Sequence, residues 1–257
     1  ARRVGYWLDQ FHIFLLILLR VSALLIVAPI FGHRLFLARA KVGLAVMVSM
    51  VVFPLVDGFD VPEGFFPYAV MMVGEVILGL VLGYVVLLLF IGIQFAGQLA
   101  GLQMGFGIVN VIDPQSHDQI SIIGQFLNIL AILMVLTLDG HHIILNGLLG
   151  SFEAVPLGGV VLQASIAHKL IALSSEVFVV AIKISAPILV ALFLISTAMG
   201  VLARTVPQMN VFIVGFPVQL AVGLSVLVAT LPLFQIIVER AIHLIERDVF
   251  ALVEFFA

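Results

Sequence analysis

The chain has 257 residues, of which 63% are hydrophobic and only 10% are charged, whereas soluble domains carry roughly 25% charged residues. This composition predicts an integral membrane protein. The formal net charge of -3 includes no basic block, so no nucleic-acid partner is expected. The absence of cysteine excludes disulfides and thiolate metal sites.

Apolar stretches long enough to cross a bilayer, about 20 residues, recur along the sequence. In chain order they are residues 11–31, 38–56, 69–90, 120–138, 170–202 and 211–238. The first is too long for the core of a signal peptide and has no small-residue cleavage pattern after it, so we expect it to be retained. Short connections with turn residues, such as Asp57-Gly58 and Asp139-Gly140, join the stretches. The predicted fold is a single all-α membrane unit that no linker divides.

The third stretch is longer than one upright crossing requires. No proline interrupts residues 69–106, and a helix of that length would extend roughly 57 Å against a hydrocarbon core of about 30 Å. Its second half repeats glycine and glutamine along one face, which lipid solvates poorly. We expect this face to pack closely against protein or to line an aqueous passage, and packing inside a monomeric bundle fits equally well. The face consists of Gln94, Gly97, Gln98, Gly101 and Gly105.

The last stretch of the chain, residues 239–257, has a different pattern. Apolar residues recur at helical spacing opposite charged ones, which predicts an amphipathic surface helix. The apolar positions are Ile242, Ile245, Val249, Leu252 and Val253, and the charged positions are Glu246, Arg247 and Glu254.

Basic residues do not give the spans a clear orientation. Arg2 and Arg3 precede the first stretch, while Arg34, Arg39 and Lys41 follow it. By the positive-inside rule the two clusters favour opposite topologies. Some of the stretches are therefore not expected to cross the bilayer as independent spans.

Charged residues within the apolar stretches are the first candidates for functional residues. A charge at membrane depth costs at least about 2.5 to 3.5 kcal/mol, so each is expected to be buried with a partner or with water. An ion relay and paired structural charges both fit. We favour structural pairs, because no second acidic residue lies near Glu176 and Lys183 to pass a proton on. The predicted buried charges are Arg20, Glu75, Glu176 and Lys183.

Motifs of known enzymes and metal sites are not found in the sequence. Asp139, His141 and His142 suggest three ligands, but adjacent histidines on a helix point about 100° apart and are not expected to converge on one ion. We expect Asp139 to cap a helix instead. Ser116, His117 and Asp118 are contiguous, which is not how a catalytic triad is assembled. No enzymatic activity, metal or cofactor is predicted.

Residues 204–217 read Arg-Thr-Val-Pro-Gln-Met-Asn-Val-Phe-Ile-Val-Gly-Phe-Pro. This main motif strongly resembles the signature of the FliR/SpaR/SctT family of type III export-gate subunits, and weaker matches extend over most of the chain. Supporting matches are residues 28–32 with 41–45, residues 101–105, and residues 113–116 with 125–127. One departure is Leu37, where many members have proline. The residues of the main motif favour the flagellar branch of the family. Gln208 and Asn210 offer amide groups for backbone donors and acceptors of a neighbouring subunit, and a purely intramolecular turn fits equally well. That motif contains Arg204, Val206, Pro207, Gln208, Met209, Asn210, Phe212, Gly215, Phe216 and Pro217.

This resemblance implies a structural role in protein export. Family members sit in the bacterial inner membrane at the flagellar basal body, in a helical ring with FliP and FliQ subunits, with FlhB attached and FlhA nearby. Much of the ring lies on the periplasmic side of the bilayer plane, and the ring passes unfolded flagellar substrates. The resemblance also implies a FliP-like part, about residues 1–165, followed by a FliQ-like hairpin with an amphipathic end, about residues 166–257.

The resemblance further implies that the loop after the central helix closes the channel at rest. Glycines here supply backbone freedom, apolar side chains supply bulk, and a dewetted constriction blocks ions without a tight steric seal. An ordinary surface loop is the alternative. The predicted plug consists of Gly105, Phe106, Gly107, Ile108, Val109, Asn110, Val111, Ile112 and Asp113.

A second class of function is a stand-alone secondary transporter or channel. Glu75, Glu176 and Lys183 would then be its binding charges. Such a protein is expected to contain an internal repeat with matching broken helices in both halves. The only sign of such a repeat is a weak sequence similarity between residues 103–106 and residues 208–212, which chance explains adequately.

Overall fold

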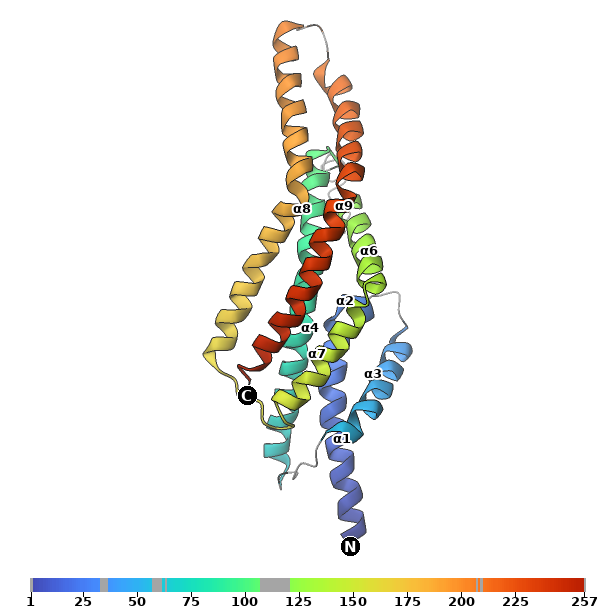
Figure 1. Ribbon diagram of the computed structural model, residues 1–257, viewed down its shortest axis with the longest axis vertical. Helices are drawn as coiled ribbons and strands as arrows, with labels where there is room; N and C mark the ends of the chain where they lie inside the picture. Colours follow the sequence, from blue (N-terminus) through green and yellow to red (C-terminus); the bar gives the residue numbers. More distant parts are fainter. Residues whose placement is uncertain are drawn as a thin grey trace. The chain divides into compact units, whose positions relative to one another are not determined.

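A computed structural model describes residues 2–32, 37–56, 62, 64–106, 121–206, 208 and 210–256. Over these ranges the chain is helical (Figure 1), which confirms the predicted all-α class. In chain order the helices are α1 (Arg2–Val27), α2 (Pro29–Gly32), α3 (Ala38–Val52), the short 3-10 helix η1 (Phe53–Leu55), α4 (Phe65–Gln103), α6 (Ile122–Thr137), α7 (Gly140–Ala154), α8 (Ala164–Thr205) and α9 (Val211–Val253).

Within the described residues, five helices are long and apolar enough to cross a membrane, or six if α6 and α7 together count as one broken span. The central helix α4 has 39 residues, as expected for a stretch too long for one upright crossing. The helices α8 and α9 extend to 42 and 43 residues. They are longer than the predicted stretches because amphipathic turns continue both helices beyond their apolar parts.

One long helix accounts for the C-terminal part of the chain. Residues 239–253, where an amphipathic surface helix was predicted, are helical but continue α9. Pro217 also lies inside α9. It is the seventh residue of α9, so the helix loses the backbone hydrogen bond that its nitrogen would donate and is otherwise maintained.

By its contacts the chain divides into two compact units. Unit 1 comprises residues 1–88, 139–174 and 242–257, and unit 2 comprises residues 89–138 and 175–241. Three of the boundaries fall inside α4, α8 and α9, and the fourth falls in the turn between α6 and α7. The division into a FliP-like part up to residue 165 and a FliQ-like part after it is a separate matter and stays a prediction.

In unit 1, α1 packs against α2, α3 and the first part of α4. Glycines on α4 allow this packing to be close. A Cβ atom on Gly79 would lie 2.8 Å from the Cβ of Ala23, and one on Gly83 would lie 2.8 Å from the Cβ of Val27. Real Cβ atoms do not approach so closely, so the two glycines form a groove on α4 that receives α1.

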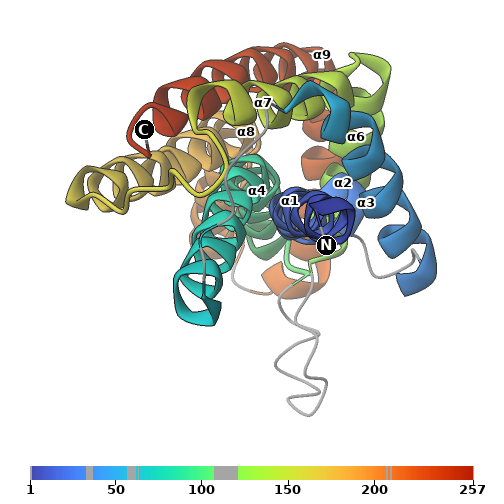
Figure 2. The ribbon, with the colours of Figure 1, turned by 90° about the horizontal axis from the view of Figure 1, so that it is seen from below.

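The end of α9 also belongs to unit 1 and lies beside α7 (Figure 2). Val249 packs against Gly147, where an added Cβ would lie 2.9 Å from the Cγ1 of Val249. The predicted apolar face of residues 242–253 is thus largely buried within the chain. On the other side of this segment, Lys169 of α8 donates to Asp248 at 2.9 Å.

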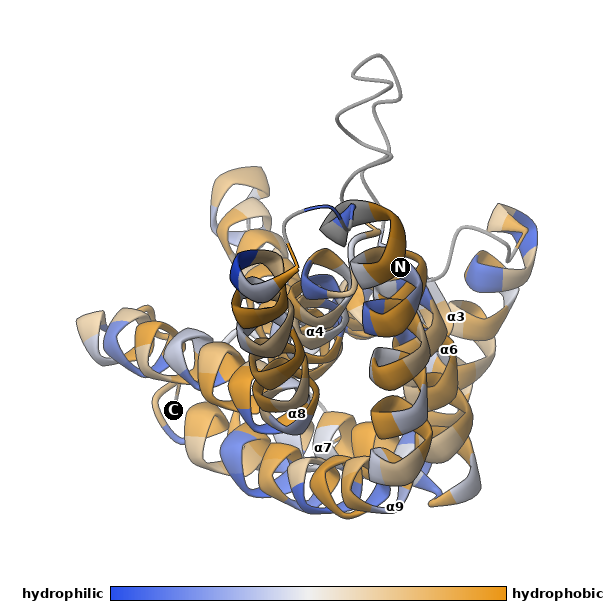
Figure 3. Ribbon diagram, turned by 90° about the horizontal axis from the view of Figure 1, so that it is seen from above, coloured by the Kyte–Doolittle hydropathy of each residue, from blue (hydrophilic) through white to orange (hydrophobic). Residues whose placement is uncertain are grey.

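Unit 2 contains the end of α4, all of α6, and the parts of α8 and α9 that form an antiparallel hairpin. Gln219 of α9 donates to Ser196 of α8 at 3.2 Å. Most residues along these helices are hydrophobic (Figure 3). Many of them are exposed in the single chain, including Phe193, Leu194 and Val228, and they offer surface to lipid or to other polypeptides.

Candidate functional site

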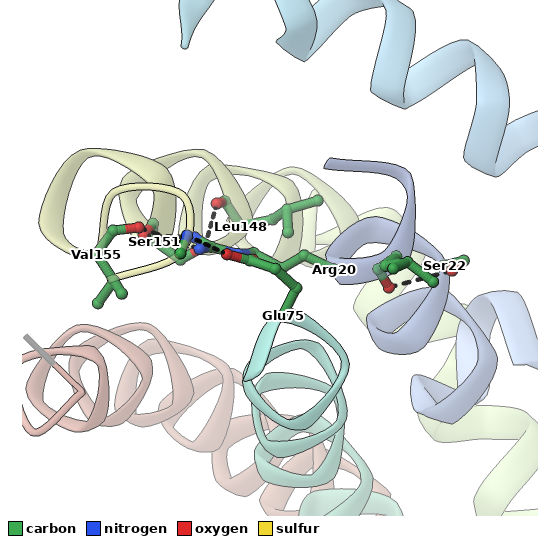
Figure 4. A network of polar contacts seen from close by, with 8 residues as sticks. Arg20, Ser22, Glu75, Leu148, Ser151 and Val155 are labelled. Carbon is green, nitrogen blue, oxygen red and sulfur yellow. Dashed lines mark hydrogen bonds and ion pairs between the residues drawn. The ribbon is translucent and has the colours of Figure 1, made fainter. Parts of the chain in front are cut away.

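Arg20 lies at the centre of a buried polar network in unit 1 (Figure 4). Its Nε donates to Oε2 of Glu75 at 2.6 Å, and neither side chain is exposed to solvent. Its Nη1 donates to the carbonyl oxygen of Ser151 at 2.8 Å, and its Nη2 donates to that of Val155 at 3.1 Å. The guanidinium is therefore bonded on all three nitrogens, by partners from α4, α7 and the residue after α7.

The carboxylate of Glu75 and the remaining face of Arg20 are occupied as well. Oε1 of Glu75 accepts a hydrogen bond from the backbone N–H of Gly158 at 3.0 Å. The Cζ of Arg20 lies 4.2 Å from the ring centroid of Phe152, a favourable cation–π geometry. A buried ion pair of this kind is tolerated because hydrogen bonds satisfy its remaining donors and acceptors.

The glycine groove on α4 makes this network possible. Gly79 lies one turn after Glu75, so both face α1. A Cβ atom on Gly79 would collide with the backbone carbonyl of Arg20. The missing side chain brings the two helices close enough for Arg20 to reach Glu75 directly, which the spacing of charges in the sequence did not reveal.

Of the four predicted buried charges, the structure brings together only Arg20 and Glu75. Glu176 and Lys183 are exposed on α8, so the expectation that they are buried is not met within this chain. The acceptors on Ser151 and Val155 were missed in the sequence, because backbone carbonyls carry no residue-specific signal. Phe152 is recognisable only once α7 is placed beside α1.

In unit 2, the predicted packing face on α4 meets the start of α6. A Cβ atom on Gly97 would lie 2.6 Å from the backbone nitrogen of Gly124. Ser121, the N-cap of α6, donates to the carbonyl of Gly97 at 3.1 Å and accepts from the N–H of Gly124 at 3.2 Å. Gly101 faces the same serine. The two helices are thus in backbone contact at their glycines.

The glutamines of this face point elsewhere. Gln94 and Gln98 are partly exposed and line an open cavity of about 350 Å³. The rest of the lining is apolar and consists of Ile91, Phe95, Val177 and Phe178. The predicted face therefore divides into a glycine side that contacts α6 and an amide side that borders a cavity.

The helix α4 ends in a glycine C-cap. The N–H of Phe106 donates to the carbonyl of Gly101 at 3.0 Å, and that of Gly105 donates to the carbonyl of Leu102 at 3.1 Å. Gly105 has a φ of 93°, which residues with a side chain rarely adopt. These bonds form a Schellman motif, which ends the helix and turns the chain sharply.

The predicted plug begins at this cap. Gly105 and Phe106 are described, and Gly105 lies against the ring of Phe216 on α9. The other plug residues, 107–113, lie outside the described residues. The plug therefore stays a prediction, and the structure describes only the helix end that precedes it.

The predicted assembly motif coincides with the connection between α8 and α9. Arg204, Val206, Gln208 and Asn210 are exposed there. Oδ1 of Asn210 accepts from the N–H of Ile213 at 3.3 Å, so Asn210 caps α9. Further along α9, a Cβ atom added to Gly215 would lie 3.5 Å from the methyl group of Met199, an ordinary contact distance. Pro207, Met209 and the side chain of Phe212 lie outside what the structure describes.

Comparison with known proteins identifies the family. Residues 11–245 match the model of "Bacterial export proteins, family 1". The flagellar biosynthetic protein FliR of Bacillus subtilis is 34% identical over 92% of this chain and 93% of its own length. FliR of Escherichia coli is 33% identical over 88% of this chain and 87% of its own, and FliR of Aquifex aeolicus is 29% identical over 96% and 95%. The chain belongs to the FliR family.

The family match includes each feature described above. Arg20, Glu75, the glycine face of α4 and the α8–α9 connection all lie between residues 11 and 245. The resemblance drawn from the motifs is thereby confirmed at the level of the family. The relatives are named as flagellar biosynthetic proteins, and the matching family is one of bacterial export proteins.

Proposed function

We propose that this chain is a structural subunit of the flagellar type III export gate and forms part of the channel for unfolded flagellar substrates. The observation that carries the proposal is the match to FliR relatives over nearly their full length. The polar network supports a structural role, because every nitrogen of the Arg20 guanidinium is engaged within the chain.

The apolar surface supports assembly with other subunits. In the most apolar 18-residue stretch of α4, 61% is buried inside the chain. The corresponding buried fractions for α8 and α9 are only 28% and 22%. Lipid and neighbouring polypeptides must cover the rest. We assign these neighbours to FliP, FliQ, FlhB and FlhA homologues, in the inner membrane at the flagellar basal body, with part of the assembly on the periplasmic side.

Within that assembly, residues 105–113 serve as the resting plug of the channel. The Schellman motif at Gly105 supports this assignment, because it ends α4 with a sharp change of direction. The segment that follows combines glycine with Ile108, Val111 and Ile112, the composition of a flexible apolar constriction.

The stand-alone transporter is less well supported. Glu75 would have to bind a solute or an ion, but both of its oxygens are already engaged, by Arg20 and by Gly158. Glu176 and Lys183 are exposed on α8 and do not converge with Glu75 in one unit.

The function is tested by deleting the gene in the bacterium that encodes it and measuring hook and filament proteins in the culture supernatant. We expect export to stop and to return when the chain is supplied from a plasmid. Membrane preparations of the complemented strain are then solubilised, and FliP and FliQ homologues are expected to co-purify with the chain. Normal export in the deletion strain, or a chain that purifies alone and moves a solute in liposomes, would contradict the proposal.

A further inference from the structure

A cluster of three metal-ligating side chains lies in unit 1 at the start of α7. It consists of Asp139, His141 and His142, and each residue offers one ligand atom within 4.8 Å of the other two. None of the three takes part in the charge network around Arg20. The cluster is therefore a separate feature, and its inference does not depend on the export function.

The ring positions of His141 and His142 answer the geometric objection to a shared ion, which was that adjacent side chains on a helix diverge by about 100°. Asp139 precedes α7 and has a φ of 54°. Its side chain makes no capping hydrogen bond, so the expected cap is not formed. The rings of His141 and His142 lie 4.1 Å apart between centroids with only 35° between their planes, so the two imidazoles are nearly stacked rather than divergent.

The distances suit a small divalent ion. Oδ1 of Asp139 lies 3.4 Å from Nδ1 of His142. Ligand atoms placed tetrahedrally at the usual bond lengths around Zn²⁺ are about 3.3 Å apart, so this pair already has the spacing of two ligands on one ion. A ring nitrogen of His141 lies within 4.8 Å of the other two ligand atoms, so it offers a third donor at the same place.

Access and available donor atoms also favour binding. The side chains of Asp139 and His142 are 75% and 64% exposed, so an ion can enter from solvent. His141 is only partly exposed, and its Nδ1 is buried without a hydrogen-bond partner in the described part of the chain. The positive end of the α7 dipole opposes a cation here, and the carboxylate of Asp139 offsets that effect.

We propose that Asp139, His141 and His142 bind a divalent transition metal ion such as Zn²⁺. Two imidazoles and one carboxylate form a donor set that suits Zn²⁺ rather than Mg²⁺ or Ca²⁺, which prefer oxygen ligands. Three protein ligands leave a fourth position for water or for a group from another chain. The ion would hold the first turn of α7 to the residue that precedes it.

The test uses the full chain, purified in its complex without a histidine tag and stripped of metal with a chelator. Co²⁺ is titrated as the probe, because tetrahedral Co²⁺ absorbs strongly in the visible range, and Zn²⁺ is then added as competitor. We expect saturation at about one ion per chain and loss of the absorption when Zn²⁺ is added.

Two variants and one control decide the outcome. Asp139→Asn keeps a residue that tolerates positive φ, so the turn is preserved while the charge is removed, and His142→Ala removes one imidazole. Both are expected to lose the saturable absorption. His168→Ala alters another exposed histidine of unit 1 and is expected to titrate like the unaltered chain. The proposal is overturned if the unaltered chain shows no saturable binding, or if all three variants retain it.

Discussion

The Nε of Arg20 and the Oε2 of Glu75 are 2.6 Å apart at the place where α1 lies in the glycine groove of α4. Close backbone approach and charge pairing thus occur at one point of unit 1. A charge inside an apolar span is costly alone, and here two charges and their hydrogen-bond partners compensate one another. The pair fixes the position of α1 against α4 and, through Ser151, against α7.

Glu75→Leu is expected to destabilise unit 1 strongly. The substitution leaves Arg20 buried without its countercharge, and breaking a buried pair in this way costs about 3–5 kcal/mol. The measurements are the amount of chain in the membrane fraction and the unfolding midpoint of the purified complex in detergent.

Two further variants separate charge from packing. Arg20→Met combined with Glu75→Leu removes both charges, so we expect it to cost less than Glu75→Leu alone. Glu176→Leu alters an exposed carboxylate on α8 and is expected to change the free energy of unfolding by no more than about 1 kcal/mol. Equal effects of Glu75→Leu and Glu176→Leu would show that the buried pair has no special structural role.

Gly97→Ala is expected to separate α4 from α6. The new methyl group would lie 2.6 Å from the backbone nitrogen of Gly124, and backbone gives way less readily than a flexible side chain. Overpacking of this kind costs about 1–3 kcal/mol. The loss is measured as a lower unfolding midpoint of the complex.

Gly200→Ala is the matched control, because it also replaces a helical glycine of unit 2. An added Cβ at Gly200 meets no atom within 4 Å. Alanine there is expected to stabilise α8 by up to about 1 kcal/mol, since glycine has the lower helix propensity. If the two substitutions shift the midpoint equally, the close contact between α4 and α6 is not the cause.

The hydrophobic pattern predicted α1, α3, α4, α6, α8 and α9 but not α7, and it did not show what covers the helices. Glu176 and Lys183 lie in an apolar stretch, yet they are exposed in this chain. Composition alone does not distinguish a helix covered by its own chain from one covered by lipid or by other subunits. Arg20 and Glu75 were recognised as charges in need of partners, but their pairing depends on how α1 packs against α4.

Local geometry explains the other differences between sequence and structure. The regular divergence of adjacent helical residues argued against an ion at His141 and His142, but the rings of these two residues are nearly stacked. Likewise, the glycine repeat on α4 predicted a close packing face without revealing that Gly124 and Ser121 would oppose it. Spacing defines a face within one helix, whereas the partner of that face is decided by the tertiary fold.

Deleting residues 107–111 is expected to raise leakage of ions and small solutes through the assembled gate. The deletion removes the apolar part of the proposed plug while leaving the cap at Gly105 in place. Conductance of the purified complex in planar bilayers measures the effect. Replacement of the same residues by a Gly-Ser segment of equal length tests the role of bulk, and it should leak similarly. Unchanged conductance in both variants would refute the plug.

Asn210→Arg is expected to prevent assembly with FliP and FliQ homologues. Asn210 is exposed at the α8–α9 connection and caps α9 through its Oδ1, so arginine removes the cap and adds a bulky charge. Loss of the cap alone costs about 1 kcal/mol, which is too little to unfold a helix of 43 residues. Asn210→Asp keeps the capping oxygen and adds no bulk, so its complex should be recovered normally. Co-purification from solubilised membranes distinguishes the two, and a normal complex carrying arginine at this position would rule out the assembly role of the motif.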